Sequence, residues 1–311
     1  MRIVFMGTSL FGVKVLTEIA QEDRFAILGV VTRPDRPAGR GLRLSPPPVR
    51  EEAERLGLPV WQPERVNHPD FVAFLRSLGC DVIVVAAYGQ ILKKELLSLP
   101  PLGCLNVHAS LLPKYRGPDP IRWTILNGDE VTGVTIMLMD EGVDTGPVLA
   151  QQSSPVAPDD TYISLVERLG TMGGRLLCRV LPVWREGQLV PRPQEGEPSY
   201  APLLGKDKAR ICWGDPSWYI TRQVRAFFPS PGAYAFFEGK RLKVLEASCE
   251  EGGGTSCPPG TIYRIEKHRG IVVCTGEGFV ILKKLQPEGR RAMSAWEFVC
   301  GYRVCEGQVF N

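Results

Sequence analysis

The sequence predicts an α/β fold: a Rossmann-like, mostly parallel sheet with helices on both faces, followed by a small all-β, OB-like barrel. Short apolar runs alternate with longer amphipathic runs through the first half of the 311-residue chain, a pattern typical of βαβ units. Prolines at positions 191, 193, 198 and 202 then indicate a linker, and glycine-separated strand-like segments follow it. We therefore predict domains at residues 1–188 and 207–311, joined by a linker at residues 189–206.

The first half contains the elements of the parallel sheet. Apolar and β-branched runs predict strands at residues 2–6, 26–32, 81–87, 104–108 and 131–139. Apolar residues at helical spacing predict helices at residues 12–20, 48–56, 69–78, 121–127 and 160–186. This alternation predicts that helices cover both faces of the sheet.

The second half has a different pattern. After a helical segment at residues 218–227, strand-like pieces occur at residues 232–237, 241–247, 260–265, 270–275 and 279–285. These pieces are short and separated by glycines, which is typical of a small antiparallel barrel.

The composition excludes several classes of protein. No apolar run approaches the about 18 residues that cross a bilayer, and the N-terminus leads directly into a strand rather than a signal peptide. Nine scattered cysteines include no Cys-x-x-Cys, and only three histidines are present. We therefore expect a cytoplasmic protein with no disulfide framework, no metal site and no membrane contact. We also expect a monomer.

Positive charge is concentrated in two places, although the net charge is only +3. Residues 207–311 carry 15 Lys+Arg against 11 Asp+Glu, whereas residues 1–206 carry 22 against 23. Within the first half, residues 32–50 hold five arginines, five prolines and one acidic residue. This concentration favours an anionic partner, although a solvated surface would also explain each cluster.

Two polar residues lie at the end of the predicted strand 104–108. Asn106 and His108 are two positions apart, so their side chains point to the same face of the strand. An amide donor and a titratable imidazole therefore converge near the edge where open α/β sheets bind ligands. Alone, such a pair is equally consistent with a structural couple.

A third polar residue, Asp144, lies in a loop at residues 140–146 that has glycines on both sides of it. The loop follows the predicted strand 131–139, and the glycines suit a shaped turn that reaches back toward a neighbouring strand end. A surface aspartate is the alternative interpretation. Asn106, His108 and Asp144 are our candidate catalytic residues.

Residues 108–113 (His-Ala-Ser-Leu-Leu-Pro), residues 115–117 (Tyr-Arg-Gly) and the 140–146 loop together resemble the signature of 10-formyltetrahydrofolate-dependent formyltransferases. The similarity covers nearly the whole chain. One departure is Asp119, because this chain has Pro-Asp-Pro-Ile at residues 118–121 where the family usually has Ala-Ala-Pro-Ile. The added charge near the presumed site makes the amino-acid pocket less well defined.

The resemblance implies transfer of a formyl group from 10-formyltetrahydrofolate to an amine, without a metal. It assigns Asn106, His108 and Asp144 as the catalytic residues. Attack of the amine on the formyl carbon gives a tetrahedral oxyanion, which the Asn106 amide can stabilise. His108 would take the amine proton or stabilise the oxyanion, and Asp144 would orient His108 and favour its charged form.

The resemblance also implies a folate site that is built largely from backbone groups. The residues of this chain that match it are Ala86, Ala87, Tyr88, Gly89, Gln90, Ser110, Leu111, Leu112, Pro113, Asp140, Glu141, Gly142 and Val143. Small and apolar residues suit such positions, because main-chain groups supply the donors and acceptors. A buried turn is the alternative at residues 110–113, and both interpretations can hold together.

Within this family, the charge distribution favours a member that formylates the α-amine of methionyl initiator tRNA for translation initiation. The arginine-rich segment could order against phosphates or unpaired nucleotides, and cations on the barrel would bind the RNA backbone. The candidate tRNA-binding residues are Arg33, Arg36, Arg40, Arg43, Arg241, Lys243, Lys283, Lys284, Arg290 and Arg291.

Other functions remain open. The same first domain could formylate a purine precursor or an amino sugar nucleotide, or could hydrolyse formyl-folate. The second domain argues against the purine enzyme, which usually has one domain. The hydrolase has a comparable two-domain layout, although the arginine-rich segment favours tRNA. A pure RNA-binding module is an alternative of another class, which the candidate catalytic set disfavours.

Overall fold

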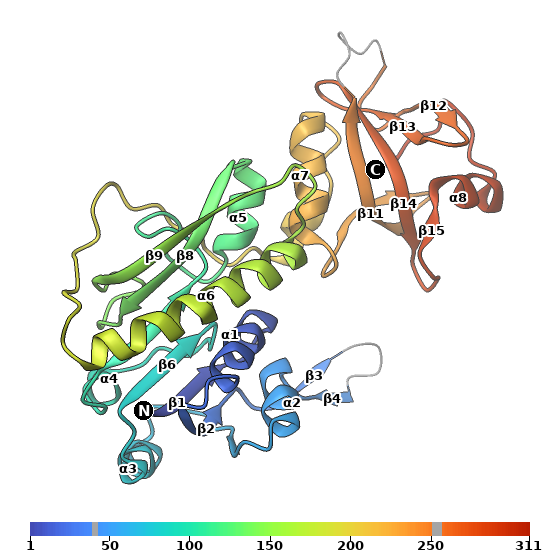
Figure 1. The fold of residues 1–311 in the computed structure, drawn as a ribbon. Coiled ribbons are helices and arrows are strands. Elements are labelled where there is room, and N and C mark those ends of the chain that lie inside the picture. The colour runs from blue at the N-terminus through green and yellow to red at the C-terminus, as the bar shows by residue number, and fades with distance from the viewer. Residues whose placement is uncertain (39–42, 251–256) are drawn as a thin grey trace. The chain divides into compact units, whose positions relative to one another are not determined.

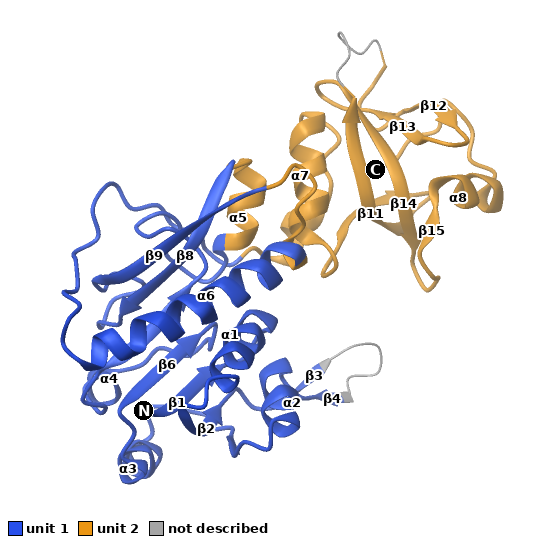
Figure 2. Ribbon diagram, in the orientation of Figure 1, with its two compact units in different colours: residues 1–120, 130–156, 164–203 blue, residues 121–129, 157–163, 204–311 orange. Residues whose placement is uncertain are grey.

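The computed structural model describes residues 1–38, 43–250 and 257–311, so the candidate residue Arg40 lies outside the described residues. The chain forms two compact units (Figure 2). Unit 1 comprises residues 1–120, 130–156 and 164–203, and unit 2 comprises residues 121–129, 157–163 and 204–311. Two short pieces of the first half therefore cluster with unit 2.

Unit 1 is built on a seven-stranded sheet with the order β5-β2-β1-β6-β7-β8-β9 (Figure 1). The first five strands in this order are parallel, and β8 and β9 are antiparallel to their neighbours. The strands are β1 (Arg2–Gly7), β2 (Ala26–Val31), β5 (Val60–Trp61), β6 (Val82–Ala86), β7 (Cys104–His108), β8 (Val131–Leu138) and β9 (Val148–Pro155). The predicted class, a mostly parallel Rossmann-like sheet, is confirmed.

Helices cover both faces of this sheet. They are α1 (Leu10–Ala20), α2 (Pro48–Arg55), α3 (Pro69–Leu78), α4 (Lys94–Leu97) and α6 (Tyr162–Arg185). On one face, α3 and α4 bury Val72, Leu75 and Leu96 in a core with β1, β6 and β7. On the other face, α6 approaches β7 closely at Gly173, where a Cβ atom would lie 2.6 Å from Val107.

Several elements of unit 1 were not predicted from the sequence, including the short strand β5 and the short helix α4. The edge strand β9 has a largely polar sequence, Val-Leu-Ala-Gln-Gln-Ser-Ser-Pro, with low strand propensity. It is a strand because it pairs with β8 along its whole length. The arginine-rich segment contains a short hairpin of β3 (Arg36–Ala38) and β4 (Arg43–Ser45), where we had predicted no strands.

Unit 2 contains an antiparallel sheet with the order β10-β11-β14-β13-β12, and β15 pairs with β14. Its strands are β10 (Ala233–Phe237), β11 (Lys240–Glu250), β12 (Ile262–Glu266), β13 (Gly270–Cys274), β14 (Phe279–Pro287) and β15 (Met293–Ser294). Its helices are α5 (Pro120–Asn127, of which residues 121–127 belong to unit 2), α7 (Ser217–Phe227), α8 (Ala295–Tyr302) and a 3₁₀ turn at Lys206–Ala209.

The C-terminal tail closes this sheet into a small barrel. On one side, the amide of Ile262 donates to Gln308 and the amide of Phe310 donates to Gly260. On the other side, Phe236 of β10 and Asn311 exchange two backbone hydrogen bonds. The tail thus pairs with both ends of the strand order, which leaves fewer unpaired edge groups.

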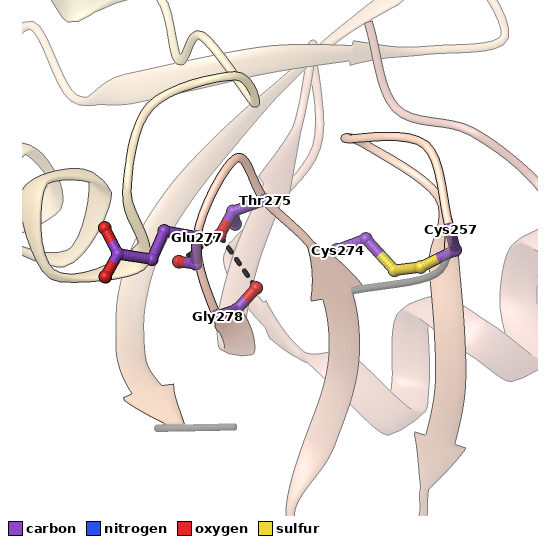
Figure 3. The surroundings of a disulfide bond; sticks show 5 residues. All are labelled: Cys257, Cys274, Thr275, Glu277 and Gly278. Atoms are coloured by element: carbon purple, nitrogen blue, oxygen red, sulfur yellow. Dashed lines mark hydrogen bonds between the residues drawn. A yellow bond between two sulfur atoms is a disulfide. The ribbon is translucent and has the colours of Figure 1, made fainter. Parts of the chain in front are cut away.

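One disulfide joins Cys257 and Cys274 in unit 2 (Figure 3). The two residues are 17 positions apart, but the fold brings their Cα atoms to 6.4 Å. We had expected no disulfide framework, because these two cysteines show no recognisable spacing motif. Burial raises the pKa of the Cys104 thiol and of the Cys178 thiol to about 12 in each case, so both remain protonated.

Candidate active site

Strand β7 presents Asn106 and His108 on one face of the sheet. Val107 points to the opposite face, where it packs against Gly173 of α6. The alternation along the strand therefore places both polar side chains on the face that does not meet α6. Asn106 is 9% exposed and His108 is 6% exposed, so both are buried polar groups that need partners.

Asp144 is a partner for both side chains, because its loop returns over the sheet toward β7. Because β7 and β8 are antiparallel with Leu105 opposite Leu138, the loop after β8 begins beside the start of β7. Asp144 adopts a left-handed backbone with φ of 53°. Its Oδ1 accepts a hydrogen bond of 3.2 Å from the Asn106 amide, and its Oδ2 lies 3.6 Å from Nδ1 of His108. The three candidate residues thus meet over the face of β7, not only at its end as we had predicted.

One contact of the His108 ring indicates its tautomer. Nε2 lies 2.9 Å from the backbone carbonyl of Tyr115. A carbonyl oxygen can only accept a hydrogen bond, so Nε2 carries a hydrogen in this arrangement. Nδ1 is the ring atom that faces Asp144.

The Tyr-Arg-Gly segment holds the same cluster from another side. The backbone amide of Gly117 donates to Oδ2 of Asp144 at 2.8 Å. Gly117 has φ of 117°, and a Cβ atom there would lie 2.9 Å from the carbonyl of Ala201. Glycine is therefore required at this position by both backbone conformation and space.

The candidate folate loop at residues 86–90 follows β6. Thr8 ties it to the end of β1 by donating to the Tyr88 carbonyl at 2.7 Å, and the Gln90 side chain bonds the backbone of Pro63 and Val66. The Tyr88 ring is 2% exposed, and burial raises the pKa of its hydroxyl. The hydroxyl has no hydrogen-bond partner among the described residues. Tyr88 therefore offers a ligand its backbone rather than its side chain.

The other two candidate folate segments also present backbone. At residues 110–113, Thr135 of β8 donates to the Ser110 carbonyl, and Gln151 of β9 donates to the Leu112 carbonyl. At residues 140–143, Asp140 accepts hydrogen bonds from the amide of Gly142 and the hydroxyl of Thr145. Residues 140–143 are exposed, with Val143 at 58%, a fraction that a bound ligand could cover.

The structure divides the arginines of the 32–50 segment into different roles. Arg33 lies against the 86–90 loop, since a Cβ atom on Gly89 would be 3.4 Å from its Nη1. Arg36 is exposed on β3, and Arg43 belongs to β4. Arg50, by contrast, forms ion pairs with Asp35 and Glu54 at 2.6 and 2.7 Å. Hydrogen bonds from Gln62 and then Arg50 lower the pKa of Asp35, so this pair persists at neutral pH.

The candidate cations of unit 2 lie on the barrel surface. Arg241 and Lys243 alternate with the buried residues Leu242 and Val244, so they share one face of β11 as predicted. The guanidinium of Arg241 stacks on Tyr234 at 3.7 Å from the ring centroid. The remaining candidates are all exposed: Lys283, Lys284, Arg290 and Arg291.

One set of residues at the site was not predicted from the sequence. Gln194 and Ser199, which we had placed in the linker, bond the Asp144 loop and the Tyr-Arg-Gly segment respectively. The proline content of the segment indicated only an extended chain, and no local signal pointed to these contacts.

Neither a membrane span nor a metal cluster is found in the part of the chain that the structure describes. No helix there is long and apolar enough to cross a bilayer. No group of three or more His, Cys, Asp or Glu side chains there could hold a metal ion.

A buried amide and imidazole and a half-buried carboxylate that converge on a Rossmann-like sheet are typical of the catalytic site of an α/β enzyme. The formyl transferase family model matches residues 1–181, and the formyl transferase C-terminal domain model matches residues 203–303. A protein of Myxococcus xanthus named methionyl-tRNA formyltransferase is 46% identical over 98% of this chain and 96% of its own length. The chain therefore belongs to the methionyl-tRNA formyltransferase family.

Solved structures share the fold at lower sequence similarity. HypX from Aquifex aeolicus in complex with tetrahydrofolic acid has a TM-score of 0.66 at 19% identity and covers 96% of this chain. This chain spans about half of HypX, 47% of its length. An N-formyltransferase of Helicobacter canadensis, bound to folinic acid and dTDP-3-aminofucose, has a TM-score of 0.63 at 19% identity over 92% of this chain and 98% of its own.

Proposed function

We propose that this chain transfers the formyl group of 10-formyltetrahydrofolate to the α-amine of methionyl initiator tRNA. The observation that carries the proposal is the buried cluster of Asn106, His108 and Asp144, held at 3.2 and 3.6 Å over β7. The names of the whole-length relatives support the choice of acceptor.

The cluster accounts for the chemistry as follows. The substrate amine attacks the formyl carbon, a new C–N bond forms, and the carbonyl oxygen becomes an oxyanion. The Asn106 amide nitrogen has two hydrogens, of which one is donated to Asp144, so the other can reach the oxyanion. Because the donor is uncharged and already fixed, it stabilises charge that develops in the transition state.

His108 moves the proton in this scheme. Nδ1 accepts the proton that the attacking amine must lose, and Asp144 stabilises the resulting imidazolium. When the intermediate collapses, the bond from carbon to the folate nitrogen breaks and that nitrogen takes the proton. Tetrahydrofolate leaves and His108 returns to its starting state.

The folate would bind at the loops 86–90, 110–113 and 140–143. Carbonyl groups of the first two loops accept hydrogen bonds from Thr8, Thr135 and Gln151. In the third loop the Gly142 amide donates to the Asp140 side chain. Such pre-formed main-chain groups suit a flat heterocycle with alternating donors and acceptors.

The tRNA would bind through cations of both units. Arg36, Arg40 and Arg43 of the arginine-rich segment would contact one part of the RNA, and Arg241 and Lys243 another. In this proposal residues 1–188 form the catalytic domain and residues 207–311 the tRNA-binding domain. We further propose that the chain acts as a monomer in the cytoplasm.

A label-transfer assay tests the proposal. The protein would be incubated with labelled formyl-folate and charged initiator tRNA, and in parallel with an amino sugar nucleotide, a purine precursor or water as acceptor. We expect label on methionyl-tRNA. Label that moves only to another acceptor would overturn the tRNA assignment, and binding of tRNA without any transfer would favour the RNA-binding module.

A further inference from the structure

Residues 194–201, which we call the strap, contact the Asp144 loop and the Tyr-Arg-Gly segment at residues 115–117. The strap belongs to unit 1, although the sequence pattern placed it in an interdomain linker. Exposure differs along the strap. Gln194 and Ser199 are half-buried and Ala201 is buried, whereas residues 195–198 are exposed. The inward side chains are those that make contacts.

Gln194 uses its whole amide in these contacts. Its nitrogen donates to the carbonyls of Asp144 and Gly146 at 2.8 Å each, and its oxygen accepts from Nε and Nη2 of Arg116 at 3.0 and 2.7 Å. One side chain therefore joins the Asp144 loop to the Tyr-Arg-Gly segment. A fully satisfied, half-buried amide of this kind fixes both groups that it bridges.

Ser199 supports the other side of the cluster. Its hydroxyl accepts from the amide of Tyr115 at 2.9 Å, and Tyr115 is the residue whose carbonyl contacts His108. Backbone hydrogen bonds also join Arg116 to Ser199 and to Ala201. The strap thus reaches Asp144 through Gln194 and His108 through Tyr115.

We propose that Gln194 is a positioning residue for catalysis, which holds Asp144 in the left-handed conformation that lets its carboxylate reach Asn106 and His108. A non-glycine residue at φ of 53° is strained and persists only where its surroundings fix it. The two bonds from Gln194 flank this position, on the carbonyls of Asp144 itself and Gly146. This inference rests on the proposed function, since Asp144 is catalytic only there.

The test compares two substitutions at one position with a matched control. Gln194→Met keeps the size and loses all polar contacts, and Gln194→Glu keeps the acceptor for Arg116 but loses both donors. Gln188→Met makes the same change at an exposed glutamine that has no side-chain hydrogen bond to a described residue. We expect both Gln194 variants to lose about 10²-fold in kcat with unchanged KM for both substrates, and the control to match the parent protein.

A double-substitution cycle separates positioning from a general structural role. If Gln194 acts through Asp144, Gln194→Met should add little to the loss caused by Asp144→Asn, because the group that it positions is already impaired. Independent multiplication of the two losses would overturn the proposal. So would normal kcat in Gln194→Glu, since the Arg116 contact would then be sufficient.

A readout that does not depend on activity keeps the two proposals apart. Hydrogen exchange at the amides of residues 142–146 should be faster in Gln194→Met than in the parent and the Gln188→Met control. If the parent protein formylated no methionyl-tRNA, the proposed function would fail, while exchange would still report on the strap. Unchanged exchange together with unchanged turnover in Gln194→Met would overturn the positioning role alone.

Discussion

The catalytic cluster of unit 1 and the cationic surfaces differ in how their polar groups are held. In the cluster, Asn106, His108 and Asp144 are mostly buried and bond to one another or to backbone at fixed distances. On the surfaces, cations such as Arg36, Lys283 and Lys284 are exposed. Buried groups with fixed partners act at one geometry, so single changes have large effects. Exposed charges act together, so a change at one of them has a small effect.

The largest expected effect tests the buried side of this comparison. His108→Ala removes the proton acceptor, and we expect kcat to fall about 10²–10⁴-fold while folate binding is retained. Single-turnover kinetics with charged initiator tRNA measure the loss, and thermal unfolding serves as the control for folding. Near-normal turnover in a correctly folded variant would remove His108 from the mechanism.

Asn106→Ala should follow with a loss of about 10²–10³-fold in kcat, because it deletes one oxyanion donor. The same change also leaves Oδ1 of Asp144 without the bond from the Asn106 amide. Comparison with Asp144→Asn, which keeps Asn106 in place, shows which of these two effects dominates. Turnover equal to that of the parent would contradict the oxyanion role.

A smaller effect is expected on the exposed side. The double change Arg40→Ala with Arg43→Ala should weaken tRNA binding and reduce the slope of log affinity against log salt by about 2, because two phosphate contacts are lost. Folate binding should be unchanged. Arg76→Ala with Arg185→Ala removes the same charge from two exposed positions outside the proposed surface. Equal weakening by both pairs would indicate only a general charge effect.

The smallest effect is expected at a helix cap that belongs to neither region. It gives a reference for the size of the other effects. Ser294 caps α8 in a capping box with Glu297, in which each side chain accepts from the other's backbone amide. Ser294→Ala should cost about 1 kcal/mol in the free energy of unfolding, measured by chemical denaturation, and should leave kcat unchanged. Ser153→Ala, an exposed serine on β9, is the matched control. A large loss of turnover would mean that unit 2 stability and catalysis are coupled.

The sequence by itself determined the elements and the chemistry that lies close together along the chain. Periodicity placed β7 at residues 104–108 and brought Asn106 and His108 to one face, because side-chain direction in a strand depends only on position. The change from alternating helices and strands to short glycine-separated strands marked the second domain. The residue pattern around His108 and Asp144 indicated the family.

Tertiary structure alone decided how distant segments meet. Gln194 lies 50 positions from Asp144, and Ser199 lies 84 positions from Tyr115, so neither contact leaves a trace in local periodicity. The same holds for the pairing of Cys257 with Cys274 and for the tail that closes the barrel at Phe236. Short-range pattern reports backbone conformation, whereas such contacts depend on how the folded sheet and its loops bring remote residues into hydrogen-bond range.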